Sequence, residues 1–245
     1  KLIEHESING ITLLNGTGAK IDKHSAVIAN GTAGDWCEHD GGYRHALCHG
    51  GLYCIPALIA EAEALNAQVK DVLRALLIGY EIIAKLAKCF KYENLKLHGH
   101  ASLAAIGAAA AIGNLRKHTP EMIFQAVNSA STLVNPGPFD HAVKGALIRN
   151  TWPGLAASNG LRAVDWVEME VIATETSIYQ IYIDIYVSFS IFLAYFPKWR
   201  SRNLRCHCVR LAGGSAGGFR RQTHSGQKLY TISRHDRGPS SHLSS

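Results

Sequence analysis

Residues 101–115 are rich in alanine and include Gly107 and Gly113. Alanine has the highest helix propensity of all residues, and its small side chain lets a helix lie close to its neighbours. We therefore expect a helix here that is packed on several sides. Such a helix requires a helix-rich interior, so this stretch favours an all-α domain.

Apolar residues recur at helical spacing on both sides of this stretch. The spacing predicts helices over residues 23–29, 55–66, 72–90, 121–130 and 153–169. Pro56, Pro120 and Pro153 each stand where a helix is expected to begin, because proline suits a first helical turn. Strands and helices do not alternate before residue 175. The apolar stripes are explained by core packing, and the predicted fold class is all-α.

Charge divides the chain into two regions. Of the 245 residues, 47% are apolar and 18% charged, which suffices for a buried core. Residues 1–175 contain 15 Lys and Arg against 17 Asp and Glu, whereas residues 176–245 contain 10 against 2. The net charge of +6 therefore gives no reason to expect a nucleic-acid partner for the helical region. We expect an N-terminally truncated helical domain over 1–175 and a disordered or poorly packed tail over 176–245.

The predicted tail carries two weak signals. Its apolar run at 177–196 is interrupted by Gln180 and Asp184, which makes a membrane span marginal, and we expect no membrane partner. The glycine-rich segment at 213–218 lacks the strand and helix that flank a phosphate-binding loop, so a linker is favoured.

Cysteine usage bears on the compartment. Six cysteines at uneven spacing do not make a disulfide framework, and no secretory signal is seen, so we expect reduced thiols. A cytoplasmic or a mitochondrial location agrees with this. The chain begins at Lys1, which leaves a preceding targeting segment open.

Ionisable residues concentrate between Asp35 and His49, and a His-Gly-His element follows at 98–100. Glu38, Asp40, Arg44 and His49 in a glycine-rich loop beside an apolar helical wall could offer a small anion a proton acceptor, a proton donor and a carboxylate clamp. An ordinary polar surface is the alternative, since most loops have no such role.

The same window also contains residue types that ligate metals. The candidates are His39, His45, Cys48, His49, His98 and His100. Paired Cys-x-x-Cys elements and a His-Glu-x-x-His helix are both missing from the sequence, and Cys206 and Cys208 stand apart in the tail. The spacing therefore predicts no metal.

Four separated segments resemble the MmgE/PrpD family of small-carboxylate lyases and isomerases, which includes 2-methylcitrate dehydratase and cis-aconitate decarboxylase. They are NGTAGDWCEHDGGYRHALCHGGLYCIPALIAEAE at 30–63, GYEIIAKL at 79–86, HGHASLAAIGAAAA at 98–111 and KGALIRNTWPGLAASNGLRAVD at 144–165. Their order and spacing agree with the family, and the resemblance covers about residues 8–172.

The resemblance implies the helical domain of a cofactor-independent, homodimeric enzyme, without the family's smaller α/β lid. It implies a carbon–oxygen or carbon–carbon lyase that dehydrates or decarboxylates a small di- or tricarboxylate, such as a 2-methylcitrate- or cis-aconitate-like acid. Which acid is used, and whether this chain is active, stay open. A catalytically dead helical binding or dimerisation module is the alternative, and a histidine-rich metal-binding hydrolase is less favoured.

The resemblance also assigns site residues. His49 matches the histidine of a Gly-His-Pro element, although Gly50 replaces the proline, and His98 matches a histidine of the substrate pocket. The expected catalytic residues are His49, His98, Glu38 and Asp40, with the two acids orienting the two histidines. The expected substrate-binding residues are Arg149, Arg44, His100 and Ser102. Asp35 departs from the family pattern, in which many members have histidine.

Overall fold

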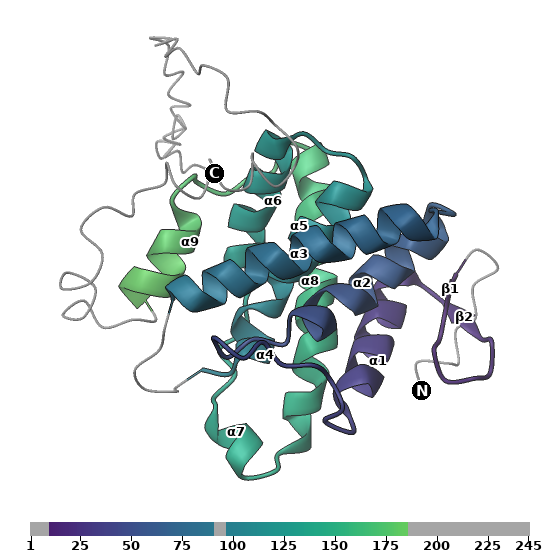
Figure 1. Ribbon diagram of the computed structural model, residues 1–245, viewed down its shortest axis with the longest axis horizontal. Helices are drawn as coiled ribbons and strands as arrows, with labels where there is room; N and C mark the ends of the chain where they lie inside the picture. Colours follow the sequence, from purple (N-terminus) through teal and green to yellow (C-terminus); the bar gives the residue numbers. More distant parts are fainter. Residues whose placement is uncertain (1–9, 91–96, 186–245) are drawn as a thin grey trace, which may run out of the picture.

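The computed structural model describes residues 10–90 and 97–185 (Figure 1), and they are mostly helical, which confirms the predicted all-α class. A two-stranded antiparallel sheet, with Ile11 opposite Ile21, precedes the helices. The elements are β1 (Ile11–Thr12), β2 (Lys20–Ile21), α1 (Lys23–Asp35), α2 (Gly50–Ala64), α3 (Val69–Cys89), α4 (Gly99–Ser102), α5 (Ala104–Leu115), α6 (Pro120–Ser131), α7 (Asp140–Val143), the 3₁₀-helix η2 (Leu147–Thr151), α8 (Trp152–Glu168), α9 (Ser177–Tyr179) and the π-helix η3 (Gln180–Ile185).

The alanine-rich helix α5 lies at the centre of the domain, where α2, α3, α6 and α8 all contact it (Figure 1). Nearly all of its residues are buried. A Cβ atom added to Gly160 of α8 would lie 2.3 Å from the backbone oxygen of Ala105, so the backbones of α5 and α8 touch. The predicted central helix is therefore confirmed, because only alanine and glycine allow helices to approach this closely.

Proline marks two of the three expected helix starts. Pro120 and Pro153 both occupy the first turn of their helices, and the Thr119 hydroxyl oxygen accepts the backbone N–H of Met122 at 3.3 Å. The expected start at Pro56 is wrong, because α2 begins at Gly50 and Pro56 lies inside it. The Pro56 side chain is buried in the domain, and the residue donates no backbone hydrogen bond to the preceding turn of α2.

Helices α1 and α8 cross at a pair of glycines. A Cβ atom added to Gly154 would lie 2.3 Å from the carbonyl oxygen of Ile28, and one added to Gly31 would lie 2.4 Å from the Cα of Gly154. The crossing sits near the end of α1 and the start of α8. It therefore fixes the distance between Asp35, the last residue of α1, and Arg149, which precedes α8.

Helical packing extends past the expected domain boundary at residue 175. Ile178, Tyr182 and Ile183 are buried in the main core, and the ring of Tyr182 stacks on Phe90 with centroids 5.3 Å apart. Packing among the described residues therefore continues to residue 183, because these apolar side chains cover the end of the helical core. The predicted tail from residue 186 onward, including Cys206, Cys208 and residues 213–218, lies outside the described residues.

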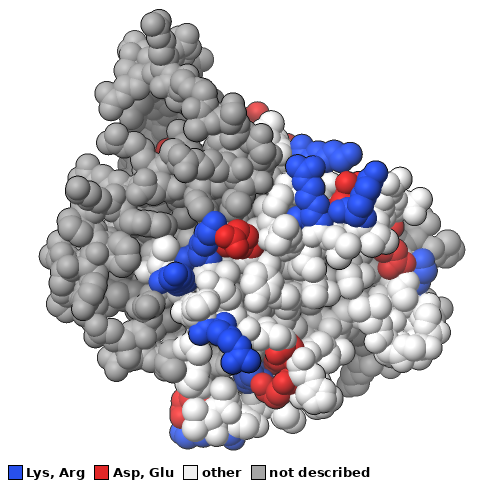
Figure 2. Space-filling model, viewed as in Figure 1, with Lys and Arg blue, Asp and Glu red and all other residues white. Residues whose placement is uncertain are grey.

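The surface in Figure 2 carries charges of both signs. Lys and Arg lie beside Asp and Glu in several small groups on this face, separated by uncharged surface. Within the described ranges, no helix has both the length and the apolarity needed to cross a bilayer. The described cysteines Cys37, Cys48, Cys54 and Cys89 are free thiols.

Candidate functional site

Four segments, of which the first two are consecutive in the chain, meet at one end of the α1–α8 crossing. They are the end of α1, the loop between α1 and α2, the start of α4, and η2. Together they contribute the residues that we call the charged cluster, namely Asp35, Glu38, Asp40, His49, His98, His100 and Arg149. His49 and His98 are the N-cap residues of α2 and α4, so the first turns of both helices position them.

Arg149 connects most of this cluster. Its two terminal nitrogens both donate to the Glu38 carboxylate, with 3.0 Å between Nη2 and Oε2. Nη1 also donates to Oδ2 of Asp35 at 3.3 Å. The Arg149 side chain is 9% exposed and its Nε atom is buried without a partner among the described residues. This guanidinium is therefore a largely desolvated cation whose charge two carboxylates balance.

His100 lies at the buried end of the cluster. Its Nε2 is 3.2 Å from Nη2 of Arg149, and its Nδ1 is 3.1 Å from the hydroxyl of Tyr53. Because arginine can only donate, the Arg149 contact favours a neutral ring whose Nε2 accepts, whereas a carboxylate at Nε2 favours a proton on that nitrogen. Asp35 Oδ1 is 3.0 Å from the same Nε2. Burial raises the pKa of Asp35, and the charge of Arg149 opposes that rise.

The two histidines of the His-Gly-His element are kept neutral. Burial lowers the pKa of His98 to about 3, assisted by His100 and Arg149, and burial likewise lowers the pKa of His100 to about 3. The His98 ring stacks on Phe139, and its Nδ1 accepts the backbone N–H of His100 at 3.3 Å. Both rings therefore act as neutral hydrogen-bonding groups beside Arg149 near neutral pH.

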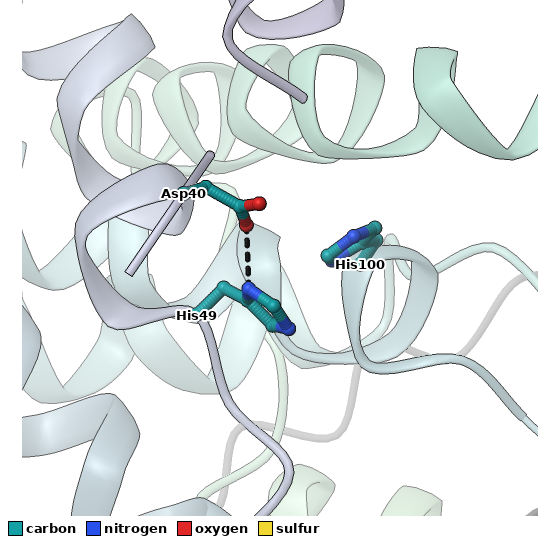
Figure 3. A group of neighbouring side chains, drawn as sticks. All are labelled: Asp40, His49 and His100. Atoms are coloured by element: carbon teal, nitrogen blue, oxygen red, sulfur yellow. Dashed lines mark ion pairs between the residues drawn. The ribbon is translucent and has the colours of Figure 1, made fainter. Parts of the chain in front are cut away.

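His49 and Asp40 form a separate pair beside these buried rings. Nδ1 of His49 lies 2.5 Å from Oδ2 of Asp40, and Figure 3 shows this pair with His100 opposite it. The His49 side chain is 30% exposed, and its ring centroid is 4.9 Å from that of His100. A carboxylate at Nδ1 favours the proton there and leaves the Nε2 lone pair free to accept another.

The predicted site residues occupy different positions relative to this cluster. Asp40 contacts His49, as expected of an orienting acid, whereas Glu38 contacts Arg149 and no histidine among the described residues.

Ser102 is buried and donates its hydroxyl to the His98 carbonyl at 3.0 Å. Arg44 is exposed, and in the described part of the chain no hydrogen bond or ion pair joins it to the cluster. The expectation that Arg44 binds substrate therefore has no geometric support here.

Sequence reasoning did not assign roles to two residues of the site, Asp35 and Tyr53. Both are fully buried, and both contact His100. Tyr53 is one helical turn after His49, which would have placed the two side chains on one face of α2. That signal was missed because α2 was expected to begin five residues later. For Asp35, the departure from the family pattern was the only signal.

Two groups in the cluster have metal-ligating side chains close together. They are Asp40, His49 and His100, and Asp35, Glu38 and Asp40, with ligand atoms within 4.8 Å of one another in each group. However, both ring nitrogens of His100 are engaged, by Tyr53 and by Arg149. In the second group, the guanidinium of Arg149 already balances the negative charge of Asp35 and Glu38. Its positive charge repels a divalent cation.

We therefore expect purified protein to retain less than stoichiometric metal after dialysis against a chelator and then against buffer. Elemental analysis by mass spectrometry measures this directly. One equivalent of zinc per chain that disappears in His49→Ala, and persists in the exposed-histidine control His39→Ala, would contradict the expectation.

Residues 2–180 match the model of the MmgE/PrpD N-terminal domain. The match covers more than half of the chain, so this all-α domain with its charged cluster belongs to the MmgE/PrpD family. Family membership indicates a lyase-type enzyme. The resemblance inferred from the four sequence segments is thereby confirmed, and the matched region extends beyond the expected limits of 8 and 172. A search of curated proteins returned no match.

Proposed function

We propose that the charged cluster binds a small di- or tricarboxylate and moves a proton at the carbon beside a carboxylate, as part of a cofactor-independent lyase. The observation that carries this proposal is a largely buried arginine beside a histidine–aspartate pair. The arginine supplies charge recognition, and the pair supplies a proton acceptor. Dehydration or decarboxylation of a 2-methylcitrate- or cis-aconitate-like acid is the chemistry that fits.

Arg149 is the group we assign to substrate binding. The two terminal nitrogens of a guanidinium match the two oxygens of a carboxylate, and Arg149 already makes this paired contact with Glu38. Shielding from water strengthens such a contact. The neutral His100 keeps the guanidinium oriented through its 3.2 Å contact with Nη2, without adding a competing charge.

His49 is the group we assign to proton transfer. Asp40 holds its Nδ1, so that Nε2 can accept a proton from carbon, and the resulting imidazolium is stabilised by the same carboxylate. The exposed part of the His49 ring is accessible to a ligand in a way that the buried His98 and His100 are not. Asp40 is then a positioning residue.

These roles account for both candidate reactions. In dehydration, His49 takes the proton of a C–H bond, the electron pair forms the carbon–carbon double bond, and the C–O bond breaks to give hydroxide, which leaves as water when the His49 imidazolium returns that proton. In decarboxylation, the C–C bond breaks to release CO2, and a protonated His49 delivers its proton to the carbon that keeps the electron pair. Arg149 stabilises the negative charge that develops next to the remaining carboxylate.

A binding or dimerisation module without catalysis is the second candidate. Three residues on one stripe of α3, Val69, Leu73 and Leu77, are at least 60% exposed. Exposed apolar side chains at helical spacing favour an interaction surface. A homodimer through the helical domain would use such a surface and would not require the charged cluster.

Titration calorimetry of the 245-residue chain with citrate, cis-aconitate and tricarballylate tests the proposal. We expect binding of at least one acid, and Arg149→Ala should weaken it about 10- to 150-fold, because a charge-assisted hydrogen-bonded pair contributes about 1.5–3 kcal/mol. Arg162→Ala, which removes an equal charge from an exposed position on α8, should change the affinity little.

Arg149→Lys serves as a second variant, because it keeps the buried charge and loses the paired contact. It should fold and should bind more weakly than the wild type. Unchanged affinity in both Arg149 variants would exclude the assigned clamp. Binding of none of the acids by the wild-type chain would favour the second candidate function.

A further inference from the structure

The charge of Arg149 is balanced by two carboxylates in very different surroundings. Asp35 is fully buried at the end of α1, and its side chain is 0% exposed. The Glu38 side chain, which belongs to the loop after α1, is 60% exposed. Removing Asp35 from the guanidinium would leave an unpaired charge in the interior, whereas Glu38 can leave it for water at little cost.

Among the described residues, Arg149 alone holds the Glu38 side chain in place. In the described part of the chain, Arg149 is the only side-chain partner of its carboxylate. Its backbone has a φ of +55°, a left-handed conformation that side-chain-bearing residues adopt infrequently, at the point where the chain leaves α1. Rotation about the Glu38 side-chain bonds therefore breaks only the contact with Arg149.

From this geometry we infer that the Glu38 carboxylate occupies the position of a substrate carboxylate on Arg149, and that substrate binding displaces it. The inference rests on the proposed function. An incoming carboxylate can take over both hydrogen bonds from the terminal nitrogens in the same paired arrangement. Asp35 and His100 stay in contact with Arg149 during this exchange, so the buried charge is never left without a partner.

The exchange determines what kind of ligand the site favours. A monocarboxylate that replaces Glu38 gains one paired contact with Arg149, but the free energy of breaking the exposed Glu38–Arg149 pair offsets part of that gain. A di- or tricarboxylate forms the same contact and still has a second carboxylate for further hydrogen bonds. Glu38 is thus a specificity-determining residue that selects for acids with more than one carboxylate.

Displacement also predicts the direction of a mutational effect. When an occupant competes with the ligand, the apparent affinity equals the intrinsic affinity multiplied by the fraction of protein whose site is free. An ion pair of this exposure contributes on the order of 1 kcal/mol, which corresponds to an apparent affinity lowered about five-fold. Removing the Glu38 charge should therefore tighten binding. A Glu38 that oriented a histidine or contacted the substrate would have the opposite effect when removed.

The experiment is calorimetric titration of the wild-type chain and Glu38→Gln with tricarballylate as the probe. We expect Glu38→Gln to bind it about five-fold more tightly. Glu38→Ala should show the same direction, because it removes the carboxylate altogether. Glu121→Gln, which removes an equal charge from an exposed position in the first turn of α6, should leave the affinity unchanged.

A parallel titration with propionate tests the selectivity. Propionate should bind the wild type much more weakly than tricarballylate and should gain affinity in Glu38→Gln. If the wild type binds tricarballylate and Glu38→Gln binds it equally or more weakly, the inference is wrong while the proposed function stands. If neither protein binds any polycarboxylate, the proposed function fails and this inference fails with it.

Discussion

Gly154→Ala is expected to lower the free energy of unfolding by about 2–3 kcal/mol. The added methyl group would lie 2.3 Å from the carbonyl oxygen of Ile28 and 2.9 Å from its Cα, so α1 and α8 must move apart. Backbone atoms of a helix cannot rotate out of the way as a side-chain end can. Urea denaturation followed by far-UV circular dichroism measures the change.

Gly51→Ala is the matched control. Gly51 also lies inside a helix, but an added Cβ there would meet only the Ile55 side chain, at an ordinary 3.6 Å. Alanine has the higher helix propensity, so this variant should be stabilised by about 0.5–1 kcal/mol. Equal stabilities of Gly154→Ala and the wild type would mean that α1 and α8 are not in backbone contact.

Acidification from pH 7 to pH 5 is expected to destabilise the domain by about 2 kcal/mol for each of His98 and His100. The folded-state pKa of both is about 3, below the value of about 6.5 that histidine has in the unfolded chain. Between these two values the unfolded state binds protons that the folded state does not, so stability falls as the pH decreases. Burial also lowers the pKa of His24, which adds an effect of the same sign.

This pH range separates the histidines from the acids whose pKa the fold lowers, whereas the raised pKa of Asp35 acts in the opposite direction. The carboxylates whose pKa the fold lowers, Asp22, Glu61 and Glu63, remain ionised in both states above about pH 5, and their contribution to stability is lost only at lower pH.

His100→Asn should therefore lose less stability between pH 7 and pH 5 than the wild type, measured as urea midpoints at each pH. His39→Asn, at an exposed position, should behave as the wild type. An identical loss in His100→Asn and the wild type would contradict the expected pKa of His100.

Local signals predicted most of the helical architecture. The alanine-rich stretch predicted the buried α5, and Thr119 with Pro120 predicted the start of α6, because these signals act within one or two helical turns. Pro56 was misread for the same reason. Its residue type favours a first turn, but its burial inside the domain allows it within α2.

Motif resemblance predicted much of the charged cluster but not its pairings. Asp40 was expected to help orient the two catalytic histidines, and its Oδ2 lies 2.5 Å from Nδ1 of His49. Glu38 was expected to orient a histidine, yet it contacts Arg149, which is 111 positions away in the chain. Asp35 and Tyr53, which have the most buried contacts with His100, carried no strong sequence signal.

The sequence by itself determined the all-α class, the central alanine-rich helix and the family to which the chain belongs. The tertiary structure alone decided which carboxylate pairs with Arg149, that His98 and His100 stay neutral, and that packing continues to Ile183. The physical reason is the distance along the chain over which each kind of interaction acts. Helix propensity and capping depend on neighbours a few residues away, whereas ion pairs and burial depend on where separate helices cross, here at Gly31 and Gly154.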